Sequence, residues 1–254
     1  YRKNHYGIVA SWSLPLDSSG KLLINGLADY VRYDLVTAEA KDQVSIFGYT
    51  AAGRTDWLKN ISAQLVKKFN SRFKSTVSIG YSERAATASE LYGFYLFNSS
   101  DGFDYIGNPV LKNESSLQAE VSGNYSRNMT KVQLTIFGSI INNYIIGSIN
   151  PGFSSMTIGA RGVKTFENIP KAWVAGFEAS VVAKPFAQTE LISTLRYSWG
   201  IHSNNEPLPF IPPLKNITSI RYHPGRFSAQ LESEAVVQQN RVSYKTGEDA
   251  KTGY

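Results

Sequence analysis

The sequence predicts an all-β protein, built as an antiparallel up-and-down meander. Its clearest strand covers residues 117–125, where apolar or small side chains alternate strictly with polar ones. Because successive side chains of a strand point to opposite faces, this segment has one apolar and one polar face. The alternation recurs along the chain, long and short connections alternate, and no helix as long as about three turns is predicted. These observations favour strands that pair with their sequence neighbours.

Four strands are predicted in the first third of the chain, at residues 7–13, 22–36, 57–69 and 74–83. Proline and glycine in segment 14–21 favour a turn. In the second strand Ile24 faces opposite Asn25, as the alternation requires. Segment 37–56 is polar and contains glycine, which predicts a long loop, whereas 70–73 is a short turn.

Six more strands follow, at residues 115–125, 130–149, 173–183, 189–200, 215–222 and 227–242. Long loops are predicted at 84–114, 150–170 and 202–214, the last because proline cannot donate to a sheet ladder. The connections near 126–129, Pro185 and 223–226 are short. The long loops thus gather at one end of the meander and the tight turns at the other. This is the build of outer-membrane barrels.

Composition excludes several classes of protein. The chain has no cysteine and only three histidines, which lie far apart in the sequence, so neither a disulfide framework nor a local metal site is predicted. The net charge of +6 comes from scattered Lys and Arg and not from a basic stripe, so no nucleic-acid partner is expected. No apolar run reaches the roughly 20 residues of a membrane helix.

Two all-β architectures share this alternation, a membrane barrel and a soluble β-sandwich. Sandwich strands are usually shorter, and sandwich loops are not sorted by length to one end. Aromatic residues also gather near the predicted strand ends, where the girdles of a membrane barrel lie; they are Tyr125, Tyr144, Trp173 and Trp199. The pattern therefore favours the barrel.

Short motifs in the last two thirds of the chain resemble the TonB-dependent outer-membrane receptors. The matches, in family order, are Glu90-Leu91-Tyr92-Gly93, then Gly107-Asn108-Pro109-Val110-Leu111-Lys112-Asn113-Glu114-Ser115, Phe137 with Asn143-Tyr144-Ile145, Asn168 with Ala172-Gly176-Phe177-Glu178, and Leu208-Pro209-Phe210-Ile211-Pro212-Pro213. Asn143 replaces the family's usual Asp. Each match is weak alone, whereas the ordered set is specific.

This resemblance implies a 22-stranded transmembrane β-barrel with an internal plug. Residues 1–254 would form a middle-to-late part of that barrel, without the plug and the final strands. The implied function is TonB-dependent import of a ferric siderophore or another metal chelate across the outer membrane of a Gram-negative bacterium. The implied partners are the chelate, outer-membrane lipid and the TonB complex, which acts through the plug. No catalytic residue, cofactor or enzyme activity is expected.

The second long loop is the candidate ligand-binding surface, since its rings can bury a ligand and its cations can pair with an anionic chelate. The candidates are Arg84, Tyr92, Phe94, Tyr95, Phe97, Phe103 and Tyr105, together with Arg161 from the next loop. The rings could instead pack loop against loop, and Arg84 could be a satisfied charge inside the barrel. A non-specific porin and a glycan-binding β-sandwich remain as alternatives. The sequence does not define the ligand, although the scarcity of loop histidines disfavours haem.

Overall fold

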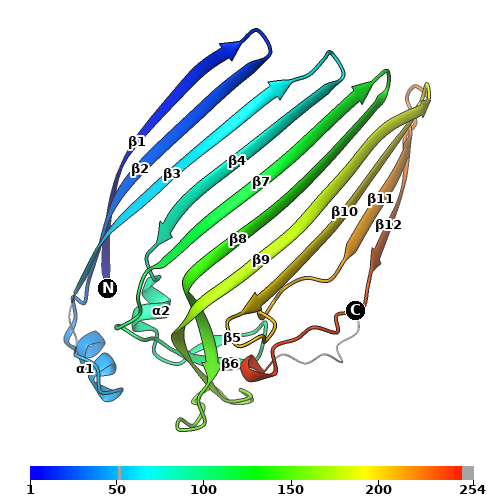
Figure 1. Cartoon of the computed structure of the whole chain (residues 1–254). Coiled ribbons are helices and arrows are strands. Elements are labelled where there is room, and N and C mark those ends of the chain that lie inside the picture. The colour runs from blue at the N-terminus through cyan, green and yellow to red at the C-terminus, as the bar shows by residue number, and fades with distance from the viewer. Residues whose placement is uncertain (51–52, 248–254) are drawn as a thin grey trace.

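The computed structural model describes residues 1–50 and 53–247; the predicted loop 37–56 and the domain span 1–254 include residues outside these ranges. Ten strands form one open, curved wall in sequence order (Figure 1). They are β1 (Arg2–Asp17), β2 (Gly20–Asp34), β3 (Arg54–Lys68), β4 (Phe73–Arg84), β7 (Glu114–Arg127), β8 (Thr130–Ile149), β9 (Val163–Phe186), β10 (Thr189–His202), β11 (Lys215–Tyr222) and β12 (Ala229–Val236). Each pairs antiparallel with its neighbour. The predicted meander is confirmed.

Short turns and long loops lie at opposite ends of this wall, as predicted (Figure 1). The long loops contain further elements that the sequence pattern did not predict. These elements are α1 (Ala38–Ile46), α2 (Ala88–Tyr92), the hairpin of β5 (Leu96–Asn98) and β6 (Phe103–Ile106), and the 3-10 turn η1 (Tyr244–Thr246). Among the described residues, no helix has both the length and the apolar content needed to cross a membrane.

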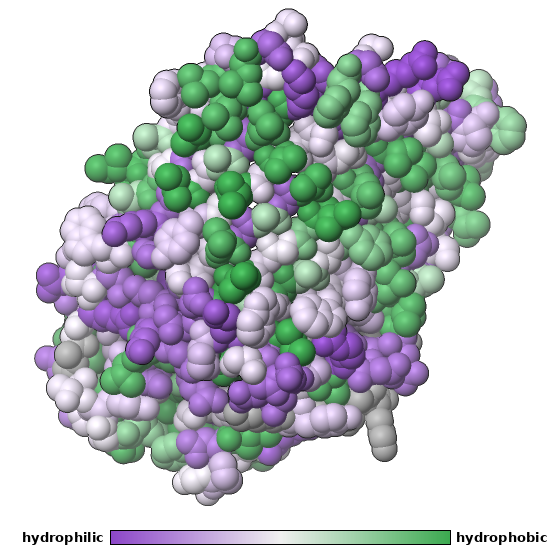
Figure 2. All heavy atoms as spheres, viewed as in Figure 1, coloured by the Kyte–Doolittle hydropathy of each residue, from purple (hydrophilic) through white to green (hydrophobic). Residues whose placement is uncertain are grey.

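The strand register sorts the side chains into two faces that run across the whole wall. Trp12, Ile24, Ala63, Ile79, Ala119, Gly138, Ala175 and Trp199 follow one another across eight strands in one apolar row. The neighbouring row on the opposite face is mostly polar and includes Asn25, Ser62 and Gln118. Figure 2 shows many hydrophobic residues over the middle of the strands and hydrophilic ones towards both the loop end and the turn end.

Aromatic side chains border the apolar face at both ends. Near the loops, the Tyr30 ring stacks on Tyr6 at 6.3 Å and meets Trp57 edge-on at 4.9 Å. At the turn end, Phe69 and Phe73 lie 5.4 Å apart. Between these borders a strand such as β2 crosses the face in about the 9–11 residues that a tilted transmembrane strand needs. The dimensions and the aromatic borders are those of a membrane-spanning wall.

Strand β9 shows where the sequence-based boundaries were wrong. It begins at Val163, whereas the sequence predicted a loop until residue 170. Pro170 lies inside the strand and lacks an N–H, and its partner position is taken by Asn143, whose φ of 53° interrupts the ladder locally. Pairing resumes beyond this point between Tyr144 and Ile169, so the proline marks an interruption and not an end.

Other boundaries differ by smaller amounts. Strand β1 is longer than the predicted 7–13, and β12 ends at Val236 instead of 242. The purely antiparallel prediction also has one exception, because β6 pairs parallel with the first residues of β9. The long loop between β4 and β7 thus adds strands of its own to the sheet. Tyr144, which was predicted to lie in an aromatic border, instead packs against a buried cluster at the loop end.

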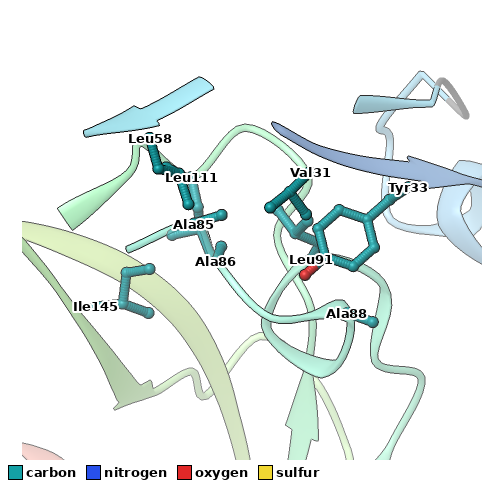
Figure 3. Close-up of a cluster of buried hydrophobic side chains, with 9 residues drawn as sticks. All are labelled: Val31, Tyr33, Leu58, Ala85, Ala86, Ala88, Leu91, Leu111 and Ile145. Carbon is teal, nitrogen blue, oxygen red and sulfur yellow. The ribbon is translucent and has the colours of Figure 1, made fainter. Parts of the chain in front are cut away.

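The main dry core lies at the loop end of the polar face. It contains Val31, Tyr33, Leu58, Ala85, Ala86, Ala88, Leu91, Leu111 and Ile145, which come from the three wall strands β2, β3 and β8 and from the loop after β4 (Figure 3). Trp57 on the apolar face is 69% exposed, whereas the next residue, Leu58, is 7% exposed beneath this loop. The described residues form one sheet without a second sheet stacked on it, so the β-sandwich alternative is wrong.

Candidate functional site

The segment that carries the motif from Gly107 to Glu114 crosses the polar face and ties distant strands together. At its start, the Asn108 side-chain amide donates to the Phe166 carbonyl of β9 (2.9 Å). The Lys112 backbone N–H donates to the Asn168 side chain (2.7 Å), and the amide of Asn168 also donates to the Asn143 carbonyl (2.6 Å). The motif residues therefore fasten a loop to the wall, and their polar groups are used for that purpose.

Strand β3 holds the other end of this segment. Arg54 donates to the Leu111 carbonyl and to the Asn113 side chain (2.6 Å). It also forms an ion pair with Asp56 (2.7 Å), and Asp56 accepts from Asn113 (2.9 Å). Arg54, Asp56 and Asn113 thus form a closed network at β3. The bond between Lys112 and Asn168 holds the other side of the segment to β9, so the segment is fastened across the polar face from β3 to β9.

Arg84 lies at the base of the same loop and is engaged by two carboxylates. It pairs with Glu90 at 2.9 Å and with Glu114 at 2.7 Å. Glu90 also completes a capping box with Thr87 at the start of α2, which fixes its position. The Arg84 guanidinium is therefore occupied within the protein, in agreement with the alternative that it is a satisfied charge.

Hairpin β5–β6 is anchored to β9 by a buried ion pair. Lys164 is 1% exposed and lies 2.5 Å from Asp101, and its ammonium group is 4.3 Å from the centre of the Phe103 ring. The Tyr105 hydroxyl donates to the same Asp101 (2.6 Å). Burial and the Asp101 carboxylate raise the pKa of Tyr105 well above its ordinary value, so this donor stays protonated. The Arg161 guanidinium also lies over the Phe103 ring, 5.2 Å from its centroid.

Asp104, next to this ion pair, is fully buried in β6. One carboxylate oxygen accepts the backbone N–H groups of Met156 (2.8 Å) and Thr157 (2.9 Å), and the other has no hydrogen-bond partner. Burial raises the pKa of Asp104, but the bonds from Thr157 and Met156 outweigh it, so the net pKa lies below its ordinary value of 3.8.

This lowered pKa predicts an acid-sensitive attachment of the loop before β9. A depressed folded-state pKa gives stability that is present above the unfolded pKa and is lost as the pH falls through the folded one. We therefore expect amide exchange at Met156 and Thr157, corrected for the intrinsic pH effect, to lose protection only below about pH 4. Asp104→Asn should abolish this pH dependence; protection that fades at neutral pH would contradict the assignment.

The remaining predicted rings separate into two groups. Phe94 and Tyr95 meet Phe47 from the α1 loop at 5.4 and 5.9 Å, and Phe153 joins Phe47 at 5.5 Å. Tyr92 instead packs beside the dry core, edge-on to Tyr33. Sequence reasoning missed Phe47 and Phe153. The available signal was that the predicted loops 37–56 and 150–170, which precede and follow loop 84–114 in the sequence, also contain aromatic residues.

A cavity of about 460 Å³ opens between the β5–β6 hairpin, strands β8 and β9, and the loop after β10. Five rings line it, namely Phe97, Tyr105, Tyr144, Phe166 and Phe210. Tyr105 is brought close to β8 by Gly147, where a Cβ atom would lie 2.4 Å from the Tyr105 ring. The structure therefore brings Phe97 and Tyr105 of the predicted set to one cavity.

The predicted ligand-binding set did not include the other three rings, although Tyr144 and Phe210 lie within the family motifs. Tyr144 and Phe166 belong to paired strand segments, and Phe210 lies between prolines of a loop distant in sequence. A larger hollow of about 540 Å³, lined by Ile136, Phe177 and Trp199 among others, opens on the apolar face. It belongs to the membrane-facing side. Within the described ranges, His, Asp and Glu side chains form no group that could hold a metal ion.

One meander sheet with an apolar band, aromatic borders and long loops at a single end defines the wall of an outer-membrane β-barrel. The chain belongs to the family described as "TonB dependent receptor-like, beta-barrel", whose model matches residues 1–254. The predicted family and its location in the outer membrane of Gram-negative bacteria are thus confirmed. The family consists of transporters and not of enzymes. Membership of this family also argues against the alternative that the chain is part of a non-specific porin.

Solved structures show the same fold at low sequence identity. The copper transporter OprC superposes with a TM-score of 0.78 at 18% identity, over 95% of this chain and 35% of its own. The siderophore receptor PirA from Pseudomonas aeruginosa gives 0.61 at 14% identity, over 91% and 48%. The FrpB iron transporter from Neisseria meningitidis gives 0.63 at 12%, over 91% and 32%. The chain thus spans less than half of each. No curated protein matches its sequence.

Proposed function

We propose that this chain is part of a receptor that imports a ferric siderophore or another metal chelate across the outer membrane, driven by TonB. Residues 1–254 contribute barrel wall and loops, and a plug inside the barrel makes the contact with TonB. The cavity beside hairpin β5–β6 is the observation that carries this proposal. Its volume lies in the range of ligand sites, and its rings surround a space at the loop end, where a solute from outside arrives first.

Rigidity supports the same assignment. Phe97 and Tyr105 lie on a hairpin that is paired to β9 and anchored by Asp101 and Lys164. Tyr144 and Phe166 lie on wall strands. A ligand that enters the cavity meets side chains already held in place, which lowers the entropy cost of binding. The known structures with this fold include proteins described as copper, iron and siderophore transporters or receptors.

Truncating a ring of the cavity tests the proposed site. Phe97→Ala and Tyr144→Ala should each weaken binding of the transported chelate about tenfold, since buried aromatic contacts dominate such sites. Ile158→Ala is the matched control, because Ile158 is a fully exposed apolar loop residue outside the cavity. Binding would be measured by fluorescence quenching on the detergent-extracted receptor, against a panel of metal chelates.

Uptake by whole cells tests the transport half of the proposal. Accumulation of the labelled chelate should require both this receptor and TonB, and should fall in the two ring variants but not in Ile158→Ala. Uptake that continues without TonB, or wild-type affinity in both ring variants, would contradict the proposal.

A further inference from the structure

None of the described residues that line the cavity is charged. Its polar groups are neutral, from Ser89, Asn98 and Ser99, and the rest of the lining is aromatic or aliphatic. A charged ligand loses hydration when it enters such a space, and without a counter-charge this loss is not recovered. The lining therefore favours an uncharged ligand surface.

Three cations at the loop end of the wall are committed to other contacts. Lys164 is enclosed behind Tyr105, paired with Asp101 and covered by the Phe103 ring. Arg84 is held by Glu90 and Glu114 and does not itself line the cavity. Arg161 lies over Phe103 and also approaches the Asp101 carbonyl (3.4 Å). The two arginines predicted to pair with an anionic chelate therefore do not line the cavity.

The hydroxyl of Tyr105 is also used within the protein, since it donates to Asp101. Its ring, together with Phe166 at 5.1 Å, presents a carbon surface to the cavity. The polar side chains at the rim carry amide and hydroxyl groups, which suit neutral carbonyl and hydroxyl groups of a ligand. Rings supply the area and these groups supply orientation.

We infer that this cavity selects chelates without net charge, such as ferric complexes of hydroxamate type, over polyanionic catecholate complexes. The inference rests on the proposed function and narrows its substrate class. Selection arises because both kinds of chelate can contact the rings, whereas only the uncharged kind enters without an uncompensated loss of hydration.

Two probes of opposite character test this inference on the detergent-extracted receptor. Neutral ferrichrome should bind at least about tenfold more tightly than trianionic ferric enterobactin. Its affinity should also stay constant between low and high salt, because uncharged ligands are not subject to screening at the roughly 10 Å Debye length of 0.1 M salt. Phe97→Ala should weaken ferrichrome binding about tenfold.

A charge added at the rim provides the decisive variant. Ser99→Lys should strengthen binding of ferric enterobactin and make it salt-dependent, whereas Ser154→Lys, an exposed position outside the cavity, should not. Tighter binding of ferric enterobactin by the unmodified receptor, lost in Phe97→Ala, would overturn the inference and leave the proposed function intact. Binding of neither probe, with no TonB-dependent uptake of either, would overturn both.

Discussion

Replacing Lys164 with methionine is expected to destabilise the β5–β6 hairpin and its attachment to β9 by about 3–5 kcal/mol. Lys164 and Asp101 form a buried pair, so loss of the ammonium leaves the Asp101 carboxylate without its counter-ion at a nearly dry position. The same substitution removes the cation above the Phe103 ring. Amide exchange of residues 103–106 and 163–165, measured on the detergent-extracted receptor, should accelerate strongly.

Lys112→Met is the matched control for this substitution, since the Lys112 side chain is exposed and its structural bonds come from the backbone. Adding Asp101→Asn to Lys164→Met should recover part of the lost protection, because the uncompensated charge is then gone. Equal exchange in the single and the double variant would show that charge burial is not the cause. Ligand affinity should fall with hairpin protection, since the hairpin carries two rings of the cavity.

Replacing Gly107 with alanine should displace the motif segment from α2 and cost about 1–3 kcal/mol or more. A Cβ atom at this position would lie 2.4 Å from the Gly93 nitrogen and 2.6 Å from the Tyr92 nitrogen, and backbone atoms cannot move aside as a flexible side chain can. The close approach is set by hydrogen bonds from Gly107 to the Gly93 carbonyl (2.8 Å) and from Asn108 to the Glu90 carbonyl (2.7 Å).

Gly138→Ala is the control, because a Cβ at Gly138 would meet no atom within 4 Å. Thermal unfolding and limited proteolysis of the loop between β4 and β7 would compare the two variants. We expect earlier cleavage in Gly107→Ala only. Cleavage at the wild-type rate in that variant would show that the segment has another way to reach the wall.

Position 107 also explains why the motif was readable in the sequence. Gly107, Asn108 and Asn168 have roles that only one residue type fills well, a close backbone approach in the first case and paired amide bonds in the other two. Such residues leave a recognisable pattern. Three of the cavity rings, Phe97, Tyr105 and Phe166, lie outside these motifs, because an aromatic surface tolerates several residue types. Phe166 accordingly resembles an ordinary strand residue.

The boundaries that sequence reasoning missed have a common cause. The sequence predicts a loop up to Pro170, yet the ladder loses only the pair at this proline and continues to Val163. Helix α1 was missed because its polar sequence matches a loop, and it is fixed by the Thr37 cap and by burial of Val44. In both cases contacts elsewhere outweigh the local preference.

The sequence by itself determined the meander, the two faces of the wall and the placement of long loops at one end. These features follow from the direction of each side chain along a strand, which is a local property with a period of two residues. Only the tertiary structure decided that Arg84 is occupied, that Asp101 meets Lys164 across 63 residues, and that five rings line one open cavity whose described lining residues are uncharged. Those facts depend on contacts between segments that are distant in the chain, and no local pattern encodes them.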